Sequence, residues 1–96
     1  MQGENKPMLG VVTFATLLLC LQYVSRVLQQ RKILGETIRN YRKQAQMSQE
    51  ELAEKANLHP VYVGKVERGE QWVSLHALLR VAHALGVRLR DVVADV

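Results

Sequence analysis

The chain has 96 residues, of which 48% are hydrophobic, and carries a formal net charge of +4. This length accommodates one small domain and an extension, and it excludes two independently packed domains. The single cysteine, Cys20, excludes an internal disulfide framework and indicates a reducing cytoplasm. Residues 1–32 carry four basic residues and one acidic residue, whereas residues 33–96 carry nine and eight, so any affinity of this second part for nucleic acid must come from a local patch.

An apolar segment occupies residues 8–21, and residues 7–25 contain no charged side chain. As a helix, these 19 uncharged residues would span about 28 Å, which is at the short end of what crosses a bilayer. Arg26, Arg31 and Lys32 follow the segment, and such a basic flank is typical of the cytoplasmic side of a membrane anchor. A cleaved signal peptide is disfavoured because no small-x-small cleavage site is evident.

The end of this segment is amphipathic, which supports a second interpretation. Its apolar residues recur every three or four positions with polar residues between them, and they are Leu17, Leu21, Val24, Val27 and Leu28. A membrane span does not need this pattern, whereas a helix that packs on a second copy of the chain does. We therefore divide the chain into residues 1–32, an apolar extension that acts as a dimerisation helix or a membrane anchor, and residues 33–96, a separate domain.

The domain is predicted to begin with a helix over about residues 33–44, because apolar side chains recur there at helical spacing. The apolar stripe, which is expected to face the core, consists of Leu34, Ile38, Tyr41 and Ala45. A second stripe is basic and consists of Arg39, Arg42 and Lys43.

Residues 48–69 are predicted to form two short helices joined by a tight turn. Ser48 is a favourable N-cap, and Glu51 three residues later completes a capping box, which fixes the start of the first helix. The buried face of this helix is expected to consist of Leu52, Ala53 and Ala56. Two helices joined in this way have the geometry that places the second helix in a DNA major groove.

The second of these helices is predicted over residues 60–68. Asn57 tolerates the left-handed conformation that ends the preceding helix, Pro60 suits the first helical position, and Gly69 ends the second helix. The inward-facing residues are Val63 and Val66, and the residues left for solvent or a partner are Val61, Tyr62, Gly64, Lys65 and Arg68.

A fourth helix is predicted over residues 75–85, with Ser74 as its N-cap and Gly86 as its C-terminal cap. Its expected core face consists of Leu75, Leu78, Leu79, Ala82 and Leu85. Residues 87–93 are expected to add a short fifth helix whose inward side chains are Leu89, Val92 and Val93.

Three ordered motifs, Ser48–Ala53, Val63–Gly69 and Ser74–Val87, resemble the lambda repressor-like, Cro-type (XRE-like) helix-turn-helix family of transcriptional regulators. The resemblance covers about residues 34–93. It implies an all-α fold, a five-helix lambda repressor-like DNA-binding domain that is preceded here by an additional N-terminal apolar helix. It also implies a sequence-specific DNA-binding transcriptional regulator, most simply a dimeric repressor that inserts helix 60–68 in the major groove.

The resemblance further implies which residues contact double-stranded DNA. The positions that usually touch the DNA backbone correspond to Gln49, His59 and Arg68. The positions that read bases correspond to Pro60, Val61, Gly64 and Lys65. This chain departs from their usual polar occupants: Lys65 is the strong hydrogen-bond donor toward guanine, and Val61 can only press on a thymine methyl. Tyr62 is expected either to contact a phosphate or sugar or to be half buried against the domain.

In the family, the arginine corresponding to Arg42 pairs with the glutamate corresponding to Glu67, so we expect a structural ion pair that mainly specifies geometry. Trp72, in the following loop, is expected to pack on the domain or to join a dimer contact. The three histidines have no cysteine cluster or close carboxylate pattern around them, so neither a metal nor a cofactor is expected. No catalytic constellation is evident, and an enzyme is not expected.

We therefore predict a homodimer that binds double-stranded DNA, with the N-terminal apolar helix as the dimer contact, in the cytoplasm and associated with the nucleoid. The alternative is a membrane-tethered or protein-binding adaptor with the same fold, anchored in the inner membrane in the tethered case. The near-neutral domain, the few base-reading groups on helix 60–68 and the apolar segment favour this alternative.

Overall fold

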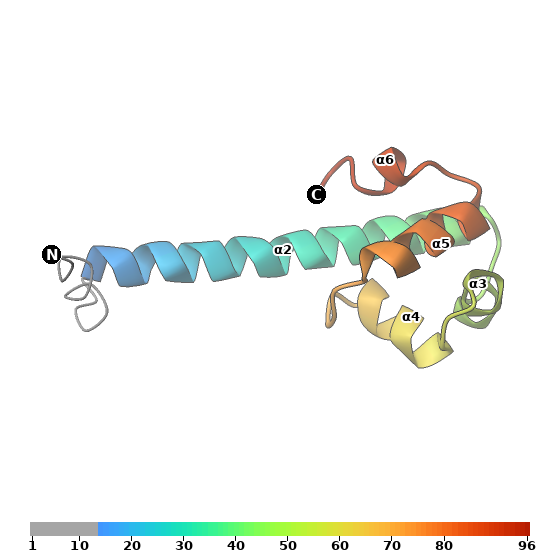
Figure 1. The fold of residues 1–96 in the computed structure, drawn as a ribbon, viewed down its shortest axis with the longest axis horizontal. Helices are drawn as coiled ribbons and strands as arrows, with labels where there is room; N and C mark the ends of the chain where they lie inside the picture. Colours follow the sequence, from blue (N-terminus) through green and yellow to red (C-terminus); the bar gives the residue numbers. More distant parts are fainter. Residues whose placement is uncertain (1–13) are drawn as a thin grey trace, which may run out of the picture.

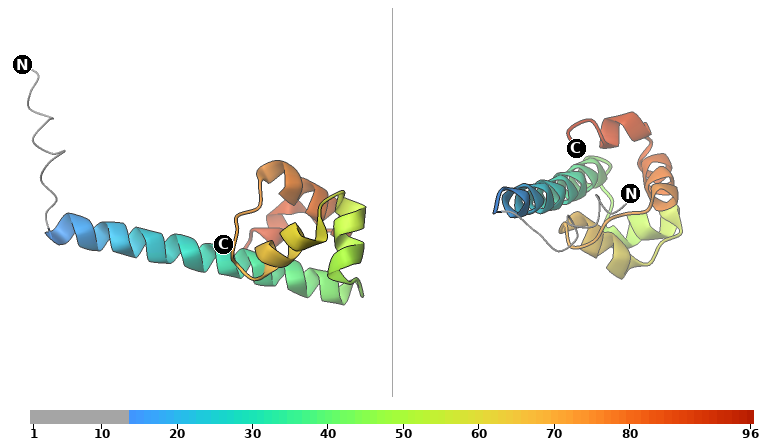
Figure 2. Two further views of the ribbon diagram at one scale, coloured as in Figure 1. Left: turned by 90° about the horizontal axis from the view of Figure 1, so that it is seen from below. Right: turned by 60° about the vertical axis from the view of Figure 1, so that its left-hand side comes forward.

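The computed structural model describes residues 14–96, and five α-helices without any strand make up this part of the chain (Figure 1). The helices are α2 (Phe14–Gln44), α3 (Gln49–Ala56), α4 (Pro60–Glu67), α5 (Leu75–Leu85) and α6 (Leu89–Val92). Both views in Figure 2 show the four short helices gathered at the C-terminal end of α2. The predicted all-α class is confirmed.

The first helix is longer than predicted. A start near Ile33 was expected, but α2 runs without interruption from Phe14 to Gln44. No proline or N-capping sequence interrupts these 31 residues, so the helix that packs in the domain continues into the extension. The extension is therefore not separated from the domain by a break in secondary structure, and residues 8–13 of the predicted apolar segment lie outside the described residues.

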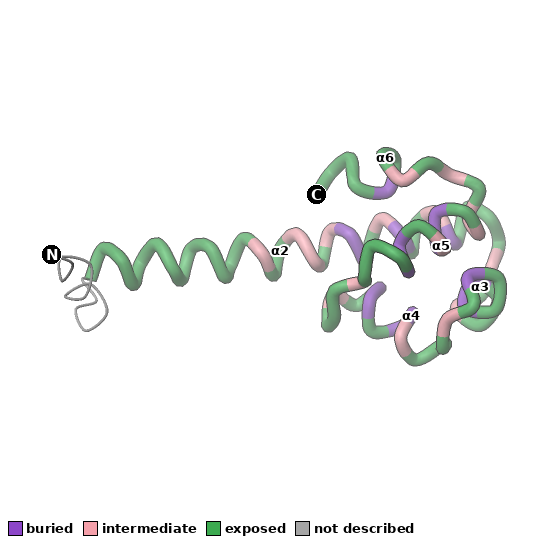
Figure 3. Tube along the Cα trace, in the orientation of Figure 1, coloured by how far each residue is buried: buried purple, intermediate pink, exposed green. Residues whose placement is uncertain are grey.

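The N-terminal half of α2 projects away from the other helices, and the molecule measures 59 × 24 × 24 Å along its principal axes. Residues 14–26 are all exposed, which appears in Figure 3 as a continuous exposed stretch. The projecting half therefore has its apolar side chains in solvent. In residues 14–96, none of the helices combines the length and the apolar character that a membrane span requires.

The core lies where α3, α4 and α5 meet the C-terminal half of α2. Helix α4 packs against both α2 and α3, and α5 packs against α3. The buried apolar cluster is contributed by all five helices and consists of Leu34, Ile38, Leu52, Ala53, Ala56, Val63, Val66, Leu78, Val81, Ala82 and Val92. The predicted inward faces of α3 and α4 are thus confirmed.

Four predicted core residues are exposed instead: Ala45, Leu75, Leu79 and Val93. Ala45 lies in the turn after α2, outside the helical stripe. The inward face of α5 is centred on residues 77, 78, 81 and 82, so Leu75 and Leu79 lie on its flank, with 65% and 47% of their surfaces exposed. Helix α6 has four residues rather than the predicted seven, and Val93 is already past its end.

The predicted cap at the start of α3 and the predicted ends of α3 and α5 are confirmed by their hydrogen bonds and backbone conformations. The Ser48 amide donates to the Glu51 carboxylate at 2.8 Å, and the Glu51 amide donates to the Ser48 hydroxyl at 3.0 Å. The hydrogen bond from the Ser48 amide to the carboxylate is the main cause that lowers the pKa of Glu51 below its usual value. Asn57 and Gly86, at the ends of α3 and α5, adopt left-handed conformations with φ values of 57° and 73°.

Gly35 sets how closely α2 and α4 approach each other. It is buried, and a Cβ atom at this position would collide with the carbonyl oxygen of Val66 and lie 2.6 Å from that of Glu67. Both oxygens belong to the backbone, so no side-chain movement relieves the contact. The absence of a side chain at Gly35 is therefore required for the position of the C-terminal end of α4.

We predict that Gly35→Ala lowers the free energy of unfolding by about 1–3 kcal/mol, because the methyl group forces the two backbones apart. Asn40→Ala, an exposed position on the same helix, is the control and is expected to stay within about 0.5 kcal/mol of the parent. Urea unfolding followed by circular dichroism measures both. An unchanged midpoint for Gly35→Ala would show that the helices are not in this close contact.

Candidate nucleic-acid interface

The N-terminus of α3 and one face of α4 enclose a shallow groove of about 260 Å³. Its lining residues are Gln49, Glu50, Pro60, Val61, Gly64 and Arg68. Helix α4 is buried on its opposite face through Val63 and Val66, so the groove is formed by the side of the helix that the core leaves free. The two-helix unit thus presents one face of α4, flanked by the start of α3, to solvent.

The start of α4 is fixed by local hydrogen bonding. His59 is its N-cap, and the His59 Nδ1 atom accepts a hydrogen bond from the Val61 amide at 3.1 Å. Pro60 occupies the first turn, where its missing N–H costs no helical hydrogen bond. His59, Pro60, Val61 and Lys65 are all exposed. These four of the predicted DNA-contacting residues are therefore accessible to a partner.

Gly64 lies differently from the prediction, because it is buried instead of exposed. A Cβ atom built there would lie 3.1 Å from Nη1 of Arg68 and 3.4 Å from Oε1 of Gln49. The side chains of Arg68 and Gln49 therefore lie over the Gly64 backbone. Glycine at this position lets two predicted phosphate-contacting residues approach each other.

Gln49 is held in place by a hydrogen bond between helices. Its Nε2 atom donates to Oε1 of Glu67 at 2.9 Å, although Gln49 starts α3 and Glu67 ends α4. This contact orients the amide at the edge of the groove while its oxygen lies near Gly64. Sequence inspection did not anticipate it, because the two residues are 18 positions apart.

Arg42 and Glu67 form a buried, two-pronged ion pair between α2 and α4. Arg42 Nε lies 2.7 Å from Oε2 of Glu67, and Nη2 lies 3.0 Å from Oε1. The remaining guanidinium nitrogen donates to the Met47 carbonyl at 2.8 Å. Only 10% of the Arg42 side chain and 2% of the Glu67 side chain are exposed. With Gln49, this pair connects α2, α3 and α4 in one network.

Arg68 forms a second ion pair of a different character. Its Nε atom lies 2.7 Å from Oε2 of Glu70, and about half of each side chain is exposed. The contact raises the pKa of Arg68 and lowers the pKa of Glu70 through the hydrogen bond between them. Because an exposed pair contributes little to stability, Arg68 can exchange Glu70 for another anion at low cost.

Tyr62 and Trp72 lie beside the interface. Tyr62 is half buried, and its hydroxyl accepts a hydrogen bond from the Ser74 amide at 3.1 Å and donates to the Trp72 carbonyl at 3.5 Å. Tyr62 is therefore half buried against the domain, and its contact with a phosphate or sugar stays a prediction. Trp72 has 42% of its surface exposed, so it is partly packed on the domain and partly accessible to a partner.

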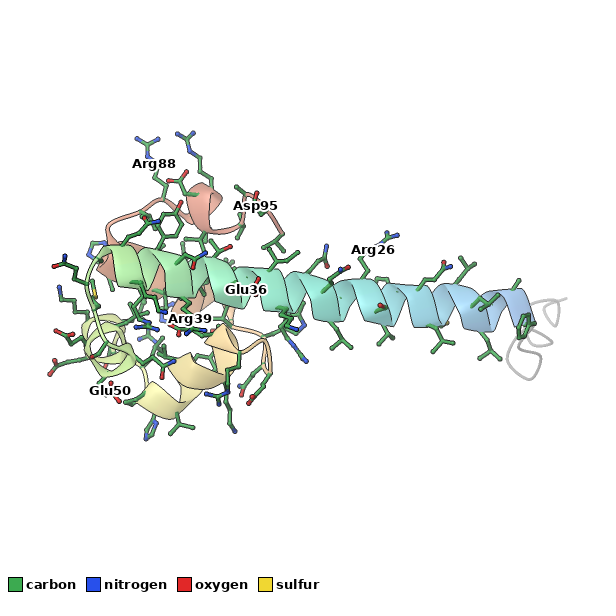
Figure 4. The ribbon with its side chains drawn as sticks, turned by 180° about the vertical axis from the view of Figure 1, so that it is seen from behind. Arg26, Glu36, Arg39, Glu50, Arg88 and Asp95 are labelled. Atoms are coloured by element: carbon green, nitrogen blue, oxygen red, sulfur yellow. The ribbon has the colours of Figure 1, made fainter. Side chains whose placement is uncertain are left out.

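Two basic residues near the groove, Lys32 and Arg39, had no predicted contact role. Both lie on the exposed surface of α2 toward α4, where Arg39 is labelled in Figure 4. Lys32 and Arg39 are seven residues apart, a spacing that places two residues on the same face of a helix. The sequence alone did not indicate this shared face, because the predicted helix began at residue 33 and left Lys32 outside it. In residues 14–96, no three histidine, cysteine or carboxylate side chains gather as a metal site.

Comparisons with known proteins agree with this arrangement. A helix-turn-helix family model matches residues 38–92, which is more than half of the chain. The chain therefore belongs to the helix-turn-helix family of lambda repressor-like DNA-binding transcription regulators. The match begins at Ile38, so the projecting half of α2 lies outside the region that the family shares.

Named relatives cover the same part of the chain. Control protein C.SmaI from Serratia marcescens is 47% identical over 55 residues, a match that spans 57% of this chain and 66% of that protein, just under two thirds. Control protein C.BamHI from Bacillus amyloliquefaciens is 39% identical over 62 residues, spanning 64% of this chain and 76% of that protein. The solved restriction-modification controller protein C.AhdI from Aeromonas hydrophila superposes with a TM-score of 0.63 at 39% identity, over 64% of this chain and 92% of that one.

We predict that Glu67→Ala lowers the free energy of unfolding by about 3–5 kcal/mol, because it leaves the Arg42 charge buried without its partner. The double variant Arg42→Met/Glu67→Leu is expected to recover most of this loss, since it removes both charges. Glu70→Ala is the matched control: it breaks an exposed arginine pair and is expected to cost less than about 1 kcal/mol. Urea unfolding measures all three, and equal losses for Glu67→Ala and Glu70→Ala would contradict the assigned burial.

Proposed function

We propose that this protein is a sequence-specific DNA-binding regulator that inserts α4 in the major groove and acts as a dimeric repressor. The observation that carries the proposal is the exposed face of α4, where Pro60 and Val61 line a groove with Gln49 and Arg68 and where Lys65 is also exposed. A helix of this size fits the major groove of B-DNA. The names of the relatives, control and controller proteins, support a regulatory role.

The residues at the edges of this face suit contacts to the DNA backbone. Gln49 lies at the N-terminus of α3, where unpaired amides and the helix dipole favour an approaching phosphate. His59 is the N-cap of α4 and is exposed at the start of that helix. Arg68 follows α4 and carries a charge that its exposed partner Glu70 only loosely holds. Such contacts position the protein without reading sequence.

Base reading rests mainly on Lys65. Pro60 and Val61 are exposed but offer no hydrogen-bond donor, and Gly64 is covered. Lys65 is exposed in the last turn of α4, and a lysine in the major groove recognises the O6 and N7 acceptors of guanine. Val61, with 57% of its surface exposed, can contact a thymine methyl group.

The projecting half of α2 supplies the proposed dimer contact. Five of its exposed apolar residues recur at alternating spacings of three and four: Phe14, Leu17, Leu21, Val24 and Leu28. This is the spacing of a two-stranded coiled coil over about two heptads. Leu18, Leu19 and Tyr23 are also exposed, outside this stripe. A single copy leaves the stripe in water, whereas two copies bury each other's stripes.

A dimer would carry two copies of α4 to two half-sites about one helical turn apart. Occupation of a promoter in this way excludes transcription by steric overlap, which makes repression the simplest regulatory outcome. We place the dimer with the DNA of the nucleoid in the cytoplasm, as the lone cysteine also suggests.

Lys65→Ala is expected to weaken binding to the preferred DNA site by about 1–3 kcal/mol and to relax the preference at one base pair, because it removes the main base donor. Site selection from a randomised duplex library, followed by fluorescence anisotropy with the selected and unrelated duplexes, measures both effects. Lys55→Ala, an exposed lysine in the last turn of α3, is the control and should leave base preference unchanged. Unchanged specific binding by Lys65→Ala would exclude α4 as the reading helix.

Leu21→Glu is expected to convert a dimer into a monomer, because it places two like charges in the apolar seam of α2. Gln22→Glu, which adds the same charge beside the seam, should remain dimeric. Light scattering on a size-exclusion column gives the molar mass of each full-length variant in detergent-free buffer. A Leu21→Glu protein that remains dimeric would move the contact elsewhere, for example to the exposed Leu75 and Leu79 of α5. Parent protein that stays soluble only in detergent would instead favour the membrane-tethered alternative.

A further inference from the structure

A second cleft, of about 410 Å³, adjoins the groove on the side toward α2. Lys32, Glu36 and Arg39 of α2 form one wall of this cleft, which we call the α2 cleft. Gln49 and Arg68 line both the α2 cleft and the groove beside α4. The two hollows are therefore neighbours, and they share the residues that we propose as phosphate contacts.

The position of the α2 wall is fixed by backbone contacts. Gly35, between Lys32 and Glu36, packs directly on the carbonyl groups at the end of α4. One position before Lys32, Arg31 Nε donates to the Gly69 carbonyl at 2.7 Å. The backbone of Lys32 also lies close to Gly69. A Cβ atom built at Gly69 would be 2.9 Å from the Cα of Lys32. The Lys32 backbone is thus held at the end of α4.

The charges in the cleft are not all compensated. Arg42 and Glu67 also line it, but each satisfies the other. Within residues 14–96, the ion pairs shorter than 4.0 Å are Arg42–Glu67 and Arg68–Glu70, so Lys32 and Arg39 remain unpaired. Glu36 is the opposing charge between them on the helix face. Two free cations and the loosely held Arg68 therefore surround one free carboxylate.

We infer that the α2 cleft binds a phosphate of the DNA backbone, with Lys32 and Arg39 as its ligands. This inference rests on the proposed function and extends the interface from α4 to the start of the projecting half of α2. Because Gln49 lines both hollows, we expect this phosphate to lie next to the one that Gln49 contacts. Lysine and arginine both bind phosphate oxygens through charge-assisted hydrogen bonds.

Glu36 allows the inference to be tested by the direction in which DNA affinity changes. Its carboxylate lies on the same wall as Lys32 and Arg39 and repels a phosphate in the cleft. Removal of the Glu36 charge therefore increases affinity for DNA, whereas removal of either cation decreases it. In Figure 4, Glu36 and Arg39 lie where α2 passes the domain, and Arg26 lies farther out on the projecting half.

A structural role for Lys32 predicts a different result. The C-terminus of α4 carries partial negative charge, and Lys32 beside Gly69 can stabilise it without any ligand. In that case, Lys32→Gln lowers the free energy of unfolding but does not change how DNA affinity depends on salt. The experiment therefore measures both properties.

The test compares full-length Lys32→Gln, Arg39→Gln and Glu36→Gln with the parent, and Arg26→Gln serves as a control with the same loss of charge. Anisotropy titrations with the selected duplex and with an unrelated duplex, from 50 to 200 mM salt, give the salt dependence. Each lost phosphate contact reduces the magnitude of the slope of log K against log salt by about 0.9. Over this salt range, the affinity of such a variant therefore falls by a factor about threefold to fourfold smaller than that of the parent.

We expect Lys32→Gln and Arg39→Gln to weaken binding to both duplexes by the same factor and to lower the slope. We expect Glu36→Gln to strengthen binding to both, and Arg26→Gln to match the parent. Unchanged slopes for both cation variants would overturn the inference, and so would a loss of slope for Arg26→Gln as large as theirs. If the parent protein itself fails to bind DNA in a salt-dependent way, the proposed function fails. This result differs from a failure of the α2-cleft inference, in which the parent binds DNA and the cation variants have the same salt dependence as the parent.

Discussion

The buried pair of Arg42 and Glu67 is the interaction on which the interface depends. Glu67 is the last residue of α4, and both its carboxylate oxygens are bound by Arg42 of α2. One of the same oxygens accepts the Gln49 amide from α3. Three helices are thereby held at one point, although desolvation of the two charges offsets much of their attraction. The pair therefore contributes more to the orientation of α4 than to net stability.

Close packing at Gly35 complements this electrostatic contact. The backbone of α2 touches the end of α4 at Gly35, between the core residues Leu34 and Ile38. Since the side chain of Lys32 extends from the same turn of α2, the contact that fixes the recognition helix also fixes the basic surface beside it. A single long helix thus contributes to the core, the interface and the projecting stripe at different points along its length.

Local features were readable in the sequence because they depend on hydrogen bonds between near neighbours. The Ser48–Glu51 capping box, the left-handed Asn57 and the glycine cap at Gly86 gave the ends of α3 and α5 to the residue. The Arg42–Glu67 pair came instead from family resemblance. Lys65 is placed on an exposed helix face as expected, but its contact with DNA remains a prediction.

Features that depend on how helices meet were not readable in the same way. The inward face of α5 differs from the one expected because Leu75 and Leu79 have the right spacing but the wrong angular position relative to α3. Gly64 was expected on the surface, and only the approach of Arg68 and Gln49 covers it. The continuity of α2 was not predicted, because the change in composition near residue 32 was interpreted as a structural boundary. A helix can continue through such a change, since its propagation does not require a uniform composition.

The sparse base-reading surface gives the proposed dimer a physical purpose. In the proposed complex, one lysine on α4 would supply about 1–3 kcal/mol of discrimination at the base pair that it contacts, which is too little to select a single site against many competing sequences. Two linked domains add their discrimination free energies, and the spacing of the half-sites becomes a further criterion. In the proposed dimer, the projecting half of α2 would compensate for what α4 lacks. Because the domain is almost neutral, its general attraction for DNA must also come from local cations near α4 rather than from net charge.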